Sequence, residues 1–157
     1  MINHFGHFYL TYLLFPLLSK ALEARIINVS SYGHLQTSES PVADLSCEKG
    51  WGSYSVYFKS KLANVMFTVS LADKLMYRPN IKAVSLHPGA VASDIYRDGC
   101  FFKFVSCIAC CCLVSNEKGA RTSLYLSKLK IEEIKSGAYY DSDSSIAEVN
   151  KVALDRE

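Results

Sequence analysis

Apolar positions fall along the chain in long runs with helical spacing and in short β-branched runs, separated by polar stretches. The long runs predict helices because their apolar residues recur over several turns, whereas the short runs predict strands. The expected helices cover residues 3–20, 55–77 and 117–129, and the expected strands cover residues 25–29, 81–86 and 136–140. The first helix is apolar nearly all round, so we expect it to be buried on several sides, against a sheet or another subunit.

This alternation of helices and strands is typical of an α/β architecture with parallel strands joined by right-handed crossovers. A chain of 157 residues has the size of one domain that can bury a core, so we expect a single unit over residues 1–157. Residues 141–157 form a polar tail, in which Ile146, Val149 and Val152 predict a weak helix.

Composition and charge exclude several classes of protein. With 50% apolar and 20% charged residues, the chain has globular rather than disordered composition. The formal net charge is +2 and no run of Lys or Arg is long, so we expect no nucleic-acid partner and no polybasic membrane arm.

The cysteines favour a reducing, intracellular compartment. Four of the six crowd together at Cys107, Cys110, Cys111 and Cys112. This spacing suits few intrachain disulfides. One Cys-x-x-Cys without a second pair makes a poor zinc site, and no histidine has a convincing ligand spacing with it, so we expect no metal.

Two apolar runs need testing as targeting segments. No Lys or Arg precedes residues 5–18, and Pro16 interrupts them, which favours a buried helix over a signal peptide. The second run begins at Phe101 and ends at Val114; it contains Lys103 and is shorter than the roughly 20 residues that span a bilayer as a helix. It suits a lid over an apolar substrate pocket or, less well, a peripheral membrane contact, so we expect a cytoplasmic or membrane-associated protein.

Tyr57 and Lys61 are the first candidates for chemistry. They are four residues apart on a predicted helix, so their side chains lie on one face. An ammonium group near a phenol favours the phenolate and makes the phenol a practical proton donor or acceptor. The spacing alone is weak evidence, because any helix rich in Tyr and Lys shows it often.

Five segments together are more specific than this pair. They are Asn-His-Phe-Gly-His-Phe at residues 3–8, Arg-Ile-Ile-Asn-Val-Ser-Ser at 25–31, Tyr-Phe-Lys-Ser-Lys-Leu-Ala-Asn-Val at 57–65, His-Pro-Gly-Ala-Val at 87–91, and residues 117–126. In this order they resemble the short-chain dehydrogenases/reductases, particularly their retinol-dehydrogenase-like branch. The resemblance covers almost the whole chain.

The resemblance implies a role for each of four residues. Tyr57 would be the general acid/base, and Lys61 would favour its phenolate form and hydrogen-bond the nicotinamide ribose. Ser31 would hold the substrate oxygen, with Ser30 as the competing choice. Asn3 would help to hold a water in the proton relay; taken alone, it would be an ordinary helix N-cap.

The resemblance also implies a site for NAD or NADP. Pro88, Gly89, Val91 and Ser93 would wrap the nicotinamide, since a glycine lets backbone approach a flat ring closely. Ser93 stands where the family usually has threonine, and its hydroxyl can still bond a carboxamide or a phosphate. The residue that would discriminate NAD from NADP belongs to a part of the family pattern that these residues do not contain.

The family's glycine-rich turn, Thr-Gly-x-x-x-Gly-x-Gly, and its Asn-Asn-Ala-Gly segment do not occur in the sequence. We therefore expect a partial Rossmann-like, doubly wound parallel sheet made of the last three strands and their flanking helices, with the amino-terminal half absent. The strand at 25–29 would then have an uncovered edge.

The sequence supports two possible functions, which belong to different classes of protein. In the first, the chain is a fragment of an NAD(P)-dependent oxidoreductase that acts on a small apolar alcohol or carbonyl, retinoid- or lipid-like. In the second, it is a catalytically inactive, shortened product that acts as an interaction or membrane-associated partner through its sheet edge and its apolar first helix. A homodimer is compatible with either function.

Overall fold

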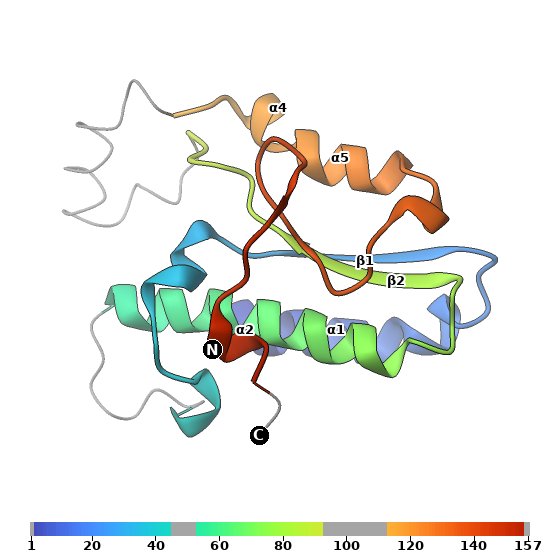
Figure 1. The fold of residues 1–157 in the computed structure, drawn as a ribbon, viewed down its shortest axis with the longest axis horizontal. Helices are drawn as coiled ribbons and strands as arrows, with labels where there is room; N and C mark the ends of the chain where they lie inside the picture. Colours follow the sequence, from blue (N-terminus) through green and yellow to red (C-terminus); the bar gives the residue numbers. More distant parts are fainter. Residues whose placement is uncertain (1, 45–52, 93–112, 156–157) are drawn as a thin grey trace.

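The computed structural model describes residues 2–44, 53–92 and 113–155, which form a sheet with helices on both faces (Figure 1). Helices α1 (Ile2–Leu18) and α2 (Ser53–Lys74) cover one face. The shorter helices α4 (Asn116–Gly119) and α5 (Arg121–Lys128) cover the other. The prediction of a layered α/β architecture is confirmed.

The sheet contains β1 (Ala24–Val29), β2 (Ile81–Leu86), β3 (Tyr139–Tyr140) and β4 (Ile146–Ala147), in that order. The first three strands are parallel, and β4 runs antiparallel to β3. Within the described ranges β1 pairs only with β2, so its outer edge has no strand beside it, as expected.

The core explains why short β-branched runs became strands. β2 is buried along almost its whole length, which is typical of a strand with helices on both faces. On the α5 side, Leu86 and Leu126 belong to one apolar cluster; on the α1 and α2 side, Ile26 and Leu75 belong to another. A third cluster joins α2 to the chain's last residues through Leu62.

The weak helix predicted in the tail was wrong. Ile146 and Ala147 form β4 instead, because the backbone of Asp141 and Ser145 closes a turn that returns the chain along β3, with an N···O distance of 2.8 Å. A 3₁₀ turn, η5 (Lys151–Ala153), follows. Val149 and Val152, which suggested the helix, pack against the third cluster, so their apolar character reflects tertiary contacts.

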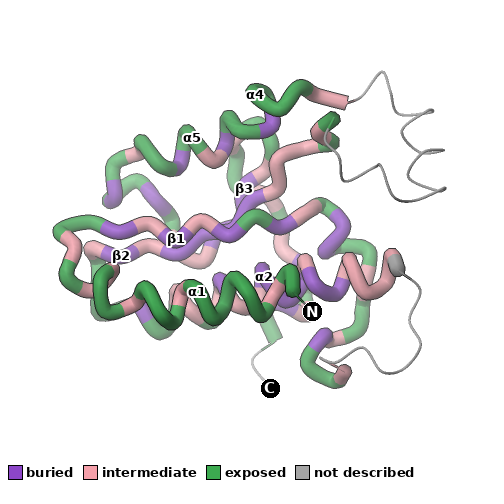
Figure 2. The backbone as a smooth tube through the Cα atoms, turned by 180° about the vertical axis from the view of Figure 1, so that it is seen from behind, coloured by how far each residue is buried: buried purple, intermediate pink, exposed green. Residues whose placement is uncertain are grey.

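The first helix is exposed where burial on several sides was expected. None of its described residues is buried, and the exposed fraction reaches 89% at Ile2 and 68% at Tyr12 (Figure 2). Among the helices and strands, α2 and β1 make most of the contacts with α1, and the apolar residues on its outward face are exposed. None of the described helices combines the length and apolarity needed to cross a membrane.

Two further elements differ from the expectation in detail. The helix expected over residues 117–129 is interrupted at Ala120, which separates α4 from α5. The polar stretch after β1 contains two 3₁₀ turns, η1 (Tyr32–Gln36) and η2 (Pro41–Asp44). The cysteine cluster and the apolar segment at residues 101–114 fall outside the described residues, except for the segment's last two positions.

Candidate active site

Helix α2 places Tyr57 and Lys61 one turn apart on the same face, as predicted. The Lys61 Nζ lies 5.7 Å from the centroid of the Tyr57 ring, and both side chains are half-buried. The same ammonium donates to the Val29 carbonyl oxygen at 3.3 Å. Burial lowers the pKa of Lys61, because a charged amine loses hydration there.

Ser30 and Ser31, in the loop after β1, make different hydrogen bonds. Ser30 is buried and its hydroxyl donates to the Lys61 carbonyl oxygen at 2.8 Å, which ties the end of β1 to α2. Ser31 is half-buried, and its Oγ accepts from the Gly33 N–H at 3.1 Å. This leaves the Ser31 O–H proton available for another acceptor, which favours Ser31 over Ser30 as the substrate-binding serine.

Gly33 lets this loop lie directly on α2. A Cβ at residue 33 would come within 2.6 Å of the Phe58 ring, closer than carbon atoms can approach. Phe58 is next to Tyr57 in the sequence, and their rings meet edge to face with centroids 5.9 Å apart. The glycine therefore brings the Ser31 loop to the turn of α2 that carries the phenol.

Asn3 lies in the first turn of α1 and contacts Ser60 and Asn64 of α2. Its amide donates to Ser60 Oγ at 3.5 Å. The backbone carbonyl oxygen of Asn3 accepts from the side-chain amide of the fully buried Asn64 at 3.1 Å. The same amide lies 3.5 Å from the Val29 carbonyl oxygen. Asn64 thus joins α1, β1 and α2 behind the Tyr57–Lys61 pair.

The loop after β2 reaches the same end of the sheet. Gly89 has a φ of +84°, a left-handed conformation that other residues rarely adopt. Val91 forms a parallel bridge with Val114, and its methyl groups fill the space where a Cβ on Gly119 of α4 would lie, only 2.4 Å away. Pro88 is half-buried in this turn; Ser93 lies outside the described residues.

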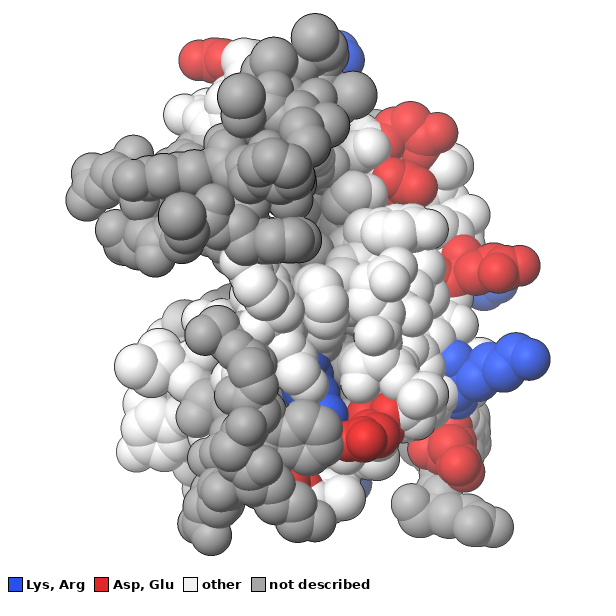
Figure 3. All heavy atoms as spheres, turned by 90° about the vertical axis from the view of Figure 1, so that its left-hand side faces the viewer, with Lys and Arg blue, Asp and Glu red and all other residues white. Residues whose placement is uncertain are grey.

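Aromatic rings connect the two loops. Tyr32, which follows Ser31, and His87, which precedes Pro88, have ring centroids 6.1 Å apart. Parallel strands place their carboxyl ends at one edge of a sheet. The site residues that the resemblance predicts, as far as the structure describes them, therefore gather at this edge. Figure 3 looks onto this end of the molecule, where the described atoms in the centre are mostly uncharged.

A buried polar group beneath the Ser31 loop was not found from the sequence. His34 is fully buried, and its Nδ1 lies 2.8 Å from the Ser31 carbonyl oxygen, so this nitrogen carries the proton. Its ring packs on that of Tyr139 with centroids 4.5 Å apart. Burial lowers the pKa of His34 and raises that of the Tyr139 phenol.

Asn150 fixes this loop from the other side. Its amide donates to the His34 and Thr37 carbonyl oxygens, both at 2.7 Å, and its own oxygen accepts from the Val152 N–H at 2.9 Å. No sequence motif signals these contacts, which join positions more than a hundred residues apart. The only hint in the sequence was the apolar spacing that follows β4.

Within the described ranges, no group of three or more His, Cys, Asp or Glu side chains is arranged to hold a metal ion. A parallel sheet between helical layers, with polar loops at its carboxyl edge, defines a Rossmann-type α/β protein.

The short chain dehydrogenase family model matches residues 1–99, and the chain belongs to this family. Its curated relatives place it in the retinol-dehydrogenase-like branch. Human Retinol dehydrogenase 11 is 35% identical over 152 residues, which is 97% of this chain and 47% of the relative. Retinol dehydrogenase 12 of Mus musculus is 37% identical over 139 residues, 88% of this chain and 43% of the relative. The chain therefore spans about half the length of these curated relatives.

Solved structures show the same fold. An NADPH-bound carbonyl reductase from chicken fatty liver superposes with a TM-score of 0.64 at 24% identity, covering 92% of this chain and 53% of that one. The carbonyl reductase Sniffer of D. melanogaster gives a TM-score of 0.62 at 24% identity, covering 94% of this chain and 54% of that one. At this level of identity, the likeness concerns the fold alone.

Proposed function

We propose that the protein to which this chain belongs is an NAD(P)-dependent oxidoreductase that interconverts an alcohol and a carbonyl compound. The observation that carries the proposal is the half-buried Lys61 ammonium, 5.7 Å from the centroid of the Tyr57 ring. Family membership and the position of Ser31 at the same edge of the sheet support it.

In this proposal the chain's own residues bind the substrate oxygen and move its proton. Ser31 donates its O–H to the substrate oxygen, because the Gly33 N–H bonds only to a lone pair of Oγ and leaves the hydroxyl proton free. The Tyr57 phenol gives a proton to that oxygen during reduction and takes it back during oxidation. The Lys61 ammonium stabilises the phenolate left behind, and Asn3 helps to hold a water that supplies protons behind Lys61.

The residues present fit the nicotinamide end of NAD or NADP. Gly89 has no side chain and a positive φ, so the turn can present its backbone to a flat ring. Pro88, Gly89, Val91 and Ser93 would line that ring, and Tyr57 and Lys61 would bond the adjoining ribose. When bound, the nicotinamide supplies or accepts the hydride.

The substrate proposed is a small apolar alcohol or carbonyl, of retinoid or lipid character. Support comes from the curated relatives, which carry retinol dehydrogenase names. The aromatic and cysteine-rich sequence between Phe101 and Val114 would line the substrate pocket or touch a membrane surface.

The direct test is Tyr57→Phe in the full-length protein. The change removes only the phenolic oxygen, so turnover should fall by at least about a thousandfold, given the usual size of acid–base and nearby electrostatic contributions. Cofactor affinity, followed by nicotinamide fluorescence, should fall by no more than about tenfold, because only one hydrogen bond to the ribose is lost. Tyr125→Phe, at an exposed tyrosine of α5, is the matched control, and turnover retained in Tyr57→Phe would refute the assigned role.

Residues 1–157 alone should bind NAD(P)H weakly. The sequence contains no glycine-rich turn of the family pattern to cradle the pyrophosphate, and that turn normally supplies backbone N–H groups at a helix N-terminus. A fluorescence titration should show binding only at millimolar cofactor. Micromolar affinity would show that the described residues hold more of the cofactor than the nicotinamide.

A further inference from the structure

The imidazole of His87 lies between the turn at residues 88–91 and the β3–β4 hairpin. Its Nδ1 accepts a hydrogen bond from the Gly89 N–H at 3.0 Å. Its Nε2 lies 3.0 Å from Asp141 Oδ1, at the start of the hairpin turn. The backbone N–H of His87 also donates to the Tyr140 carbonyl oxygen at 3.0 Å, so backbone and ring are held by the same hairpin.

These contacts select one form of the ring. A nitrogen that accepts from a backbone N–H carries no proton, so the proton of a neutral imidazole sits on the other nitrogen. Here that nitrogen is Nε2, which donates to the Asp141 carboxylate. In the opposite tautomer, two N–H groups would face each other at Gly89, and a lone pair would face the carboxylate. The surroundings therefore favour the Nε2–H form.

Asp141 is itself held in place. Its backbone N–H donates to the Ser145 carbonyl oxygen at 2.8 Å, and its carbonyl oxygen accepts from the buried Thr122 hydroxyl of α5 at 3.1 Å. The His87 ring lies parallel to Tyr139, with centroids 6.5 Å apart and planes 6° apart. The ring thus has little freedom to turn away from Gly89.

We propose that His87, held in its Nε2–H tautomer by Asp141, is a positioning residue that fixes the backbone of residues 88–91 for nicotinamide binding. Gly89 needs such support, since its left-handed φ is only one of several conformations open to glycine. The nicotinamide part of this inference rests on the proposed function, whereas the fixed turn does not.

Three variants separate the contacts. His87→Asn places an amide oxygen where Nδ1 lies and keeps an acceptor for the Gly89 N–H, but it loses Asp141. His87→Phe keeps a flat ring beside Tyr139 and removes both hydrogen bonds. Asp141→Leu keeps the His87 ring and removes the acceptor of its Nε2–H. Dispersed methyl resonances in the NMR spectrum of residues 1–157 show whether each variant is folded.

The first measurement is the hydrogen exchange of the Gly89 amide, together with the nitrogen chemical shifts of His87. In the unsubstituted chain we expect one protonated nitrogen, Nε2, and slow exchange at Gly89. Exchange should rise by about tenfold or more in His87→Phe and stay near the original rate in His87→Asn, as the lost local hydrogen bond predicts. In Asp141→Leu the two nitrogen shifts should move toward each other as the Nδ1–H tautomer becomes populated.

An unchanged Gly89 exchange rate in folded His87→Phe would overturn the inference, and so would a protonated Nδ1 in the unsubstituted chain. Should His87→Phe not fold, the tautomer shift in Asp141→Leu decides instead, and no shift there rejects the role of Asp141.

The second measurement is an NMR titration with reduced nicotinamide mononucleotide, which lacks the adenine half. The affinity for the mononucleotide should fall about tenfold in His87→Phe and stay near the original value in His87→Asn, as the Gly89 exchange rate does. The reason is that a preorganised turn lowers the cost of binding. If the unsubstituted chain binds none even at millimolar mononucleotide while Gly89 still responds to His87, the nicotinamide part of the inference fails and the fixed turn stands; turnover of Tyr57→Phe tests the proposed function separately. Equal affinity in all variants would overturn the positioning role.

Discussion

At the level of single residues, Lys61 combines a charge with burial. Its side chain is half-buried beside Tyr57, with the Val29 carbonyl oxygen as an acceptor. Burial lowers the pKa of Lys61 below the 10.5 of an exposed lysine, so the folded chain holds this proton less tightly than the unfolded chain. If this position served stability alone, an apolar side chain would be better suited to it.

Lys61→Met should therefore raise the free energy of unfolding at pH 7, where the burial cost of the charge is fully present. In the unsubstituted chain that cost falls as pH rises from the lowered pKa toward 10.5, so the gain from the substitution should shrink over the same window. Urea unfolding at several pH values measures this. Lys74→Met, at an exposed lysine of the same helix, is the control.

A stabilised but catalytically inactive Lys61→Met full-length protein would fit the proposed function. Loss of stability at pH 7 would contradict the burial argument.

At the level of elements, the chain's last residues hold the Ser31 loop in place. β4 extends the sheet, and η5 brings Asn150 beneath η1, where it donates to two carbonyl oxygens. The tail thus contributes to the candidate site without supplying a reactive group to it.

Asn150→Ala should lower the free energy of unfolding by about 1–3 kcal/mol, because the buried His34 carbonyl oxygen and the partly buried Thr37 carbonyl oxygen would lose this donor. Guanidinium unfolding of residues 1–157 measures the change. Asn116→Ala, at an exposed position of α4, should change it by less than about 0.5 kcal/mol. Equal effects of the two substitutions would show that the tail is not part of the folded unit.

Elements with local signals could be predicted from the sequence, and those set by distant contacts could not. The runs that became β1 and β2 are β-branched and short, and Tyr57 and Lys61 are bound to share a helix face by their spacing. β4 has two residues, and its pairing depends on a turn closed by backbone hydrogen bonds.

The same distinction applies to the candidate site. The five segments of the family resemblance identified Asn3, Ser31, Tyr57, Lys61 and the turn after β2; their functional roles stay predictions. His34, Asn64 and Asn150 were missed because single buried polar residues have no periodicity and gain meaning only from partners far along the chain.

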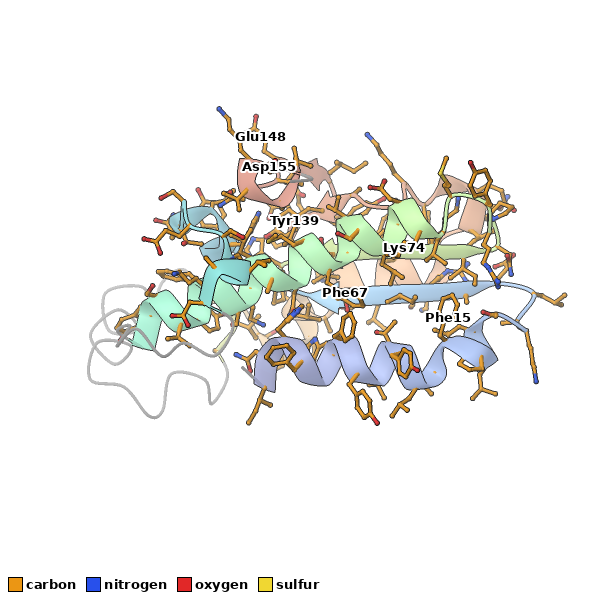
Figure 4. All side chains as sticks on the ribbon, turned by 90° about the horizontal axis from the view of Figure 1, so that it is seen from below. Phe15, Phe67, Lys74, Tyr139, Glu148 and Asp155 are labelled. Atoms are coloured by element: carbon orange, nitrogen blue, oxygen red, sulfur yellow. The ribbon has the colours of Figure 1, made fainter. Side chains whose placement is uncertain are left out.

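At the level of the whole molecule, α1 and α2 enclose an apolar groove of about 710 Å³ on the side away from α5. Figure 4 shows Phe15 and Phe67 in the space between the two helices. The outward residues of α1 continue this apolar surface, with Tyr12 and Leu17 exposed by 68% and 65%. Exposed apolar surface of this kind favours association.

We expect residues 1–157 to self-associate as concentration rises, and the charged substitutions Tyr12→Glu and Leu17→Glu to shift the chain toward the monomer. Sedimentation velocity at several concentrations measures this. Leu124→Glu on α5, exposed by 53%, adds the same charge on the other face of the sheet and should have little effect. A monomer at every concentration would contradict the expectation.

The contact between Val91 and Gly119 has a wider consequence for variation in the protein. Position 119 takes no part in proton movement or substrate binding, yet even one added methyl group there would push against Val91 and shift the backbone beside it. An inherited alanine at this position would therefore disturb the turn to which we assign the nicotinamide, although the side chains of Ser31, Tyr57 and Lys61 remained intact.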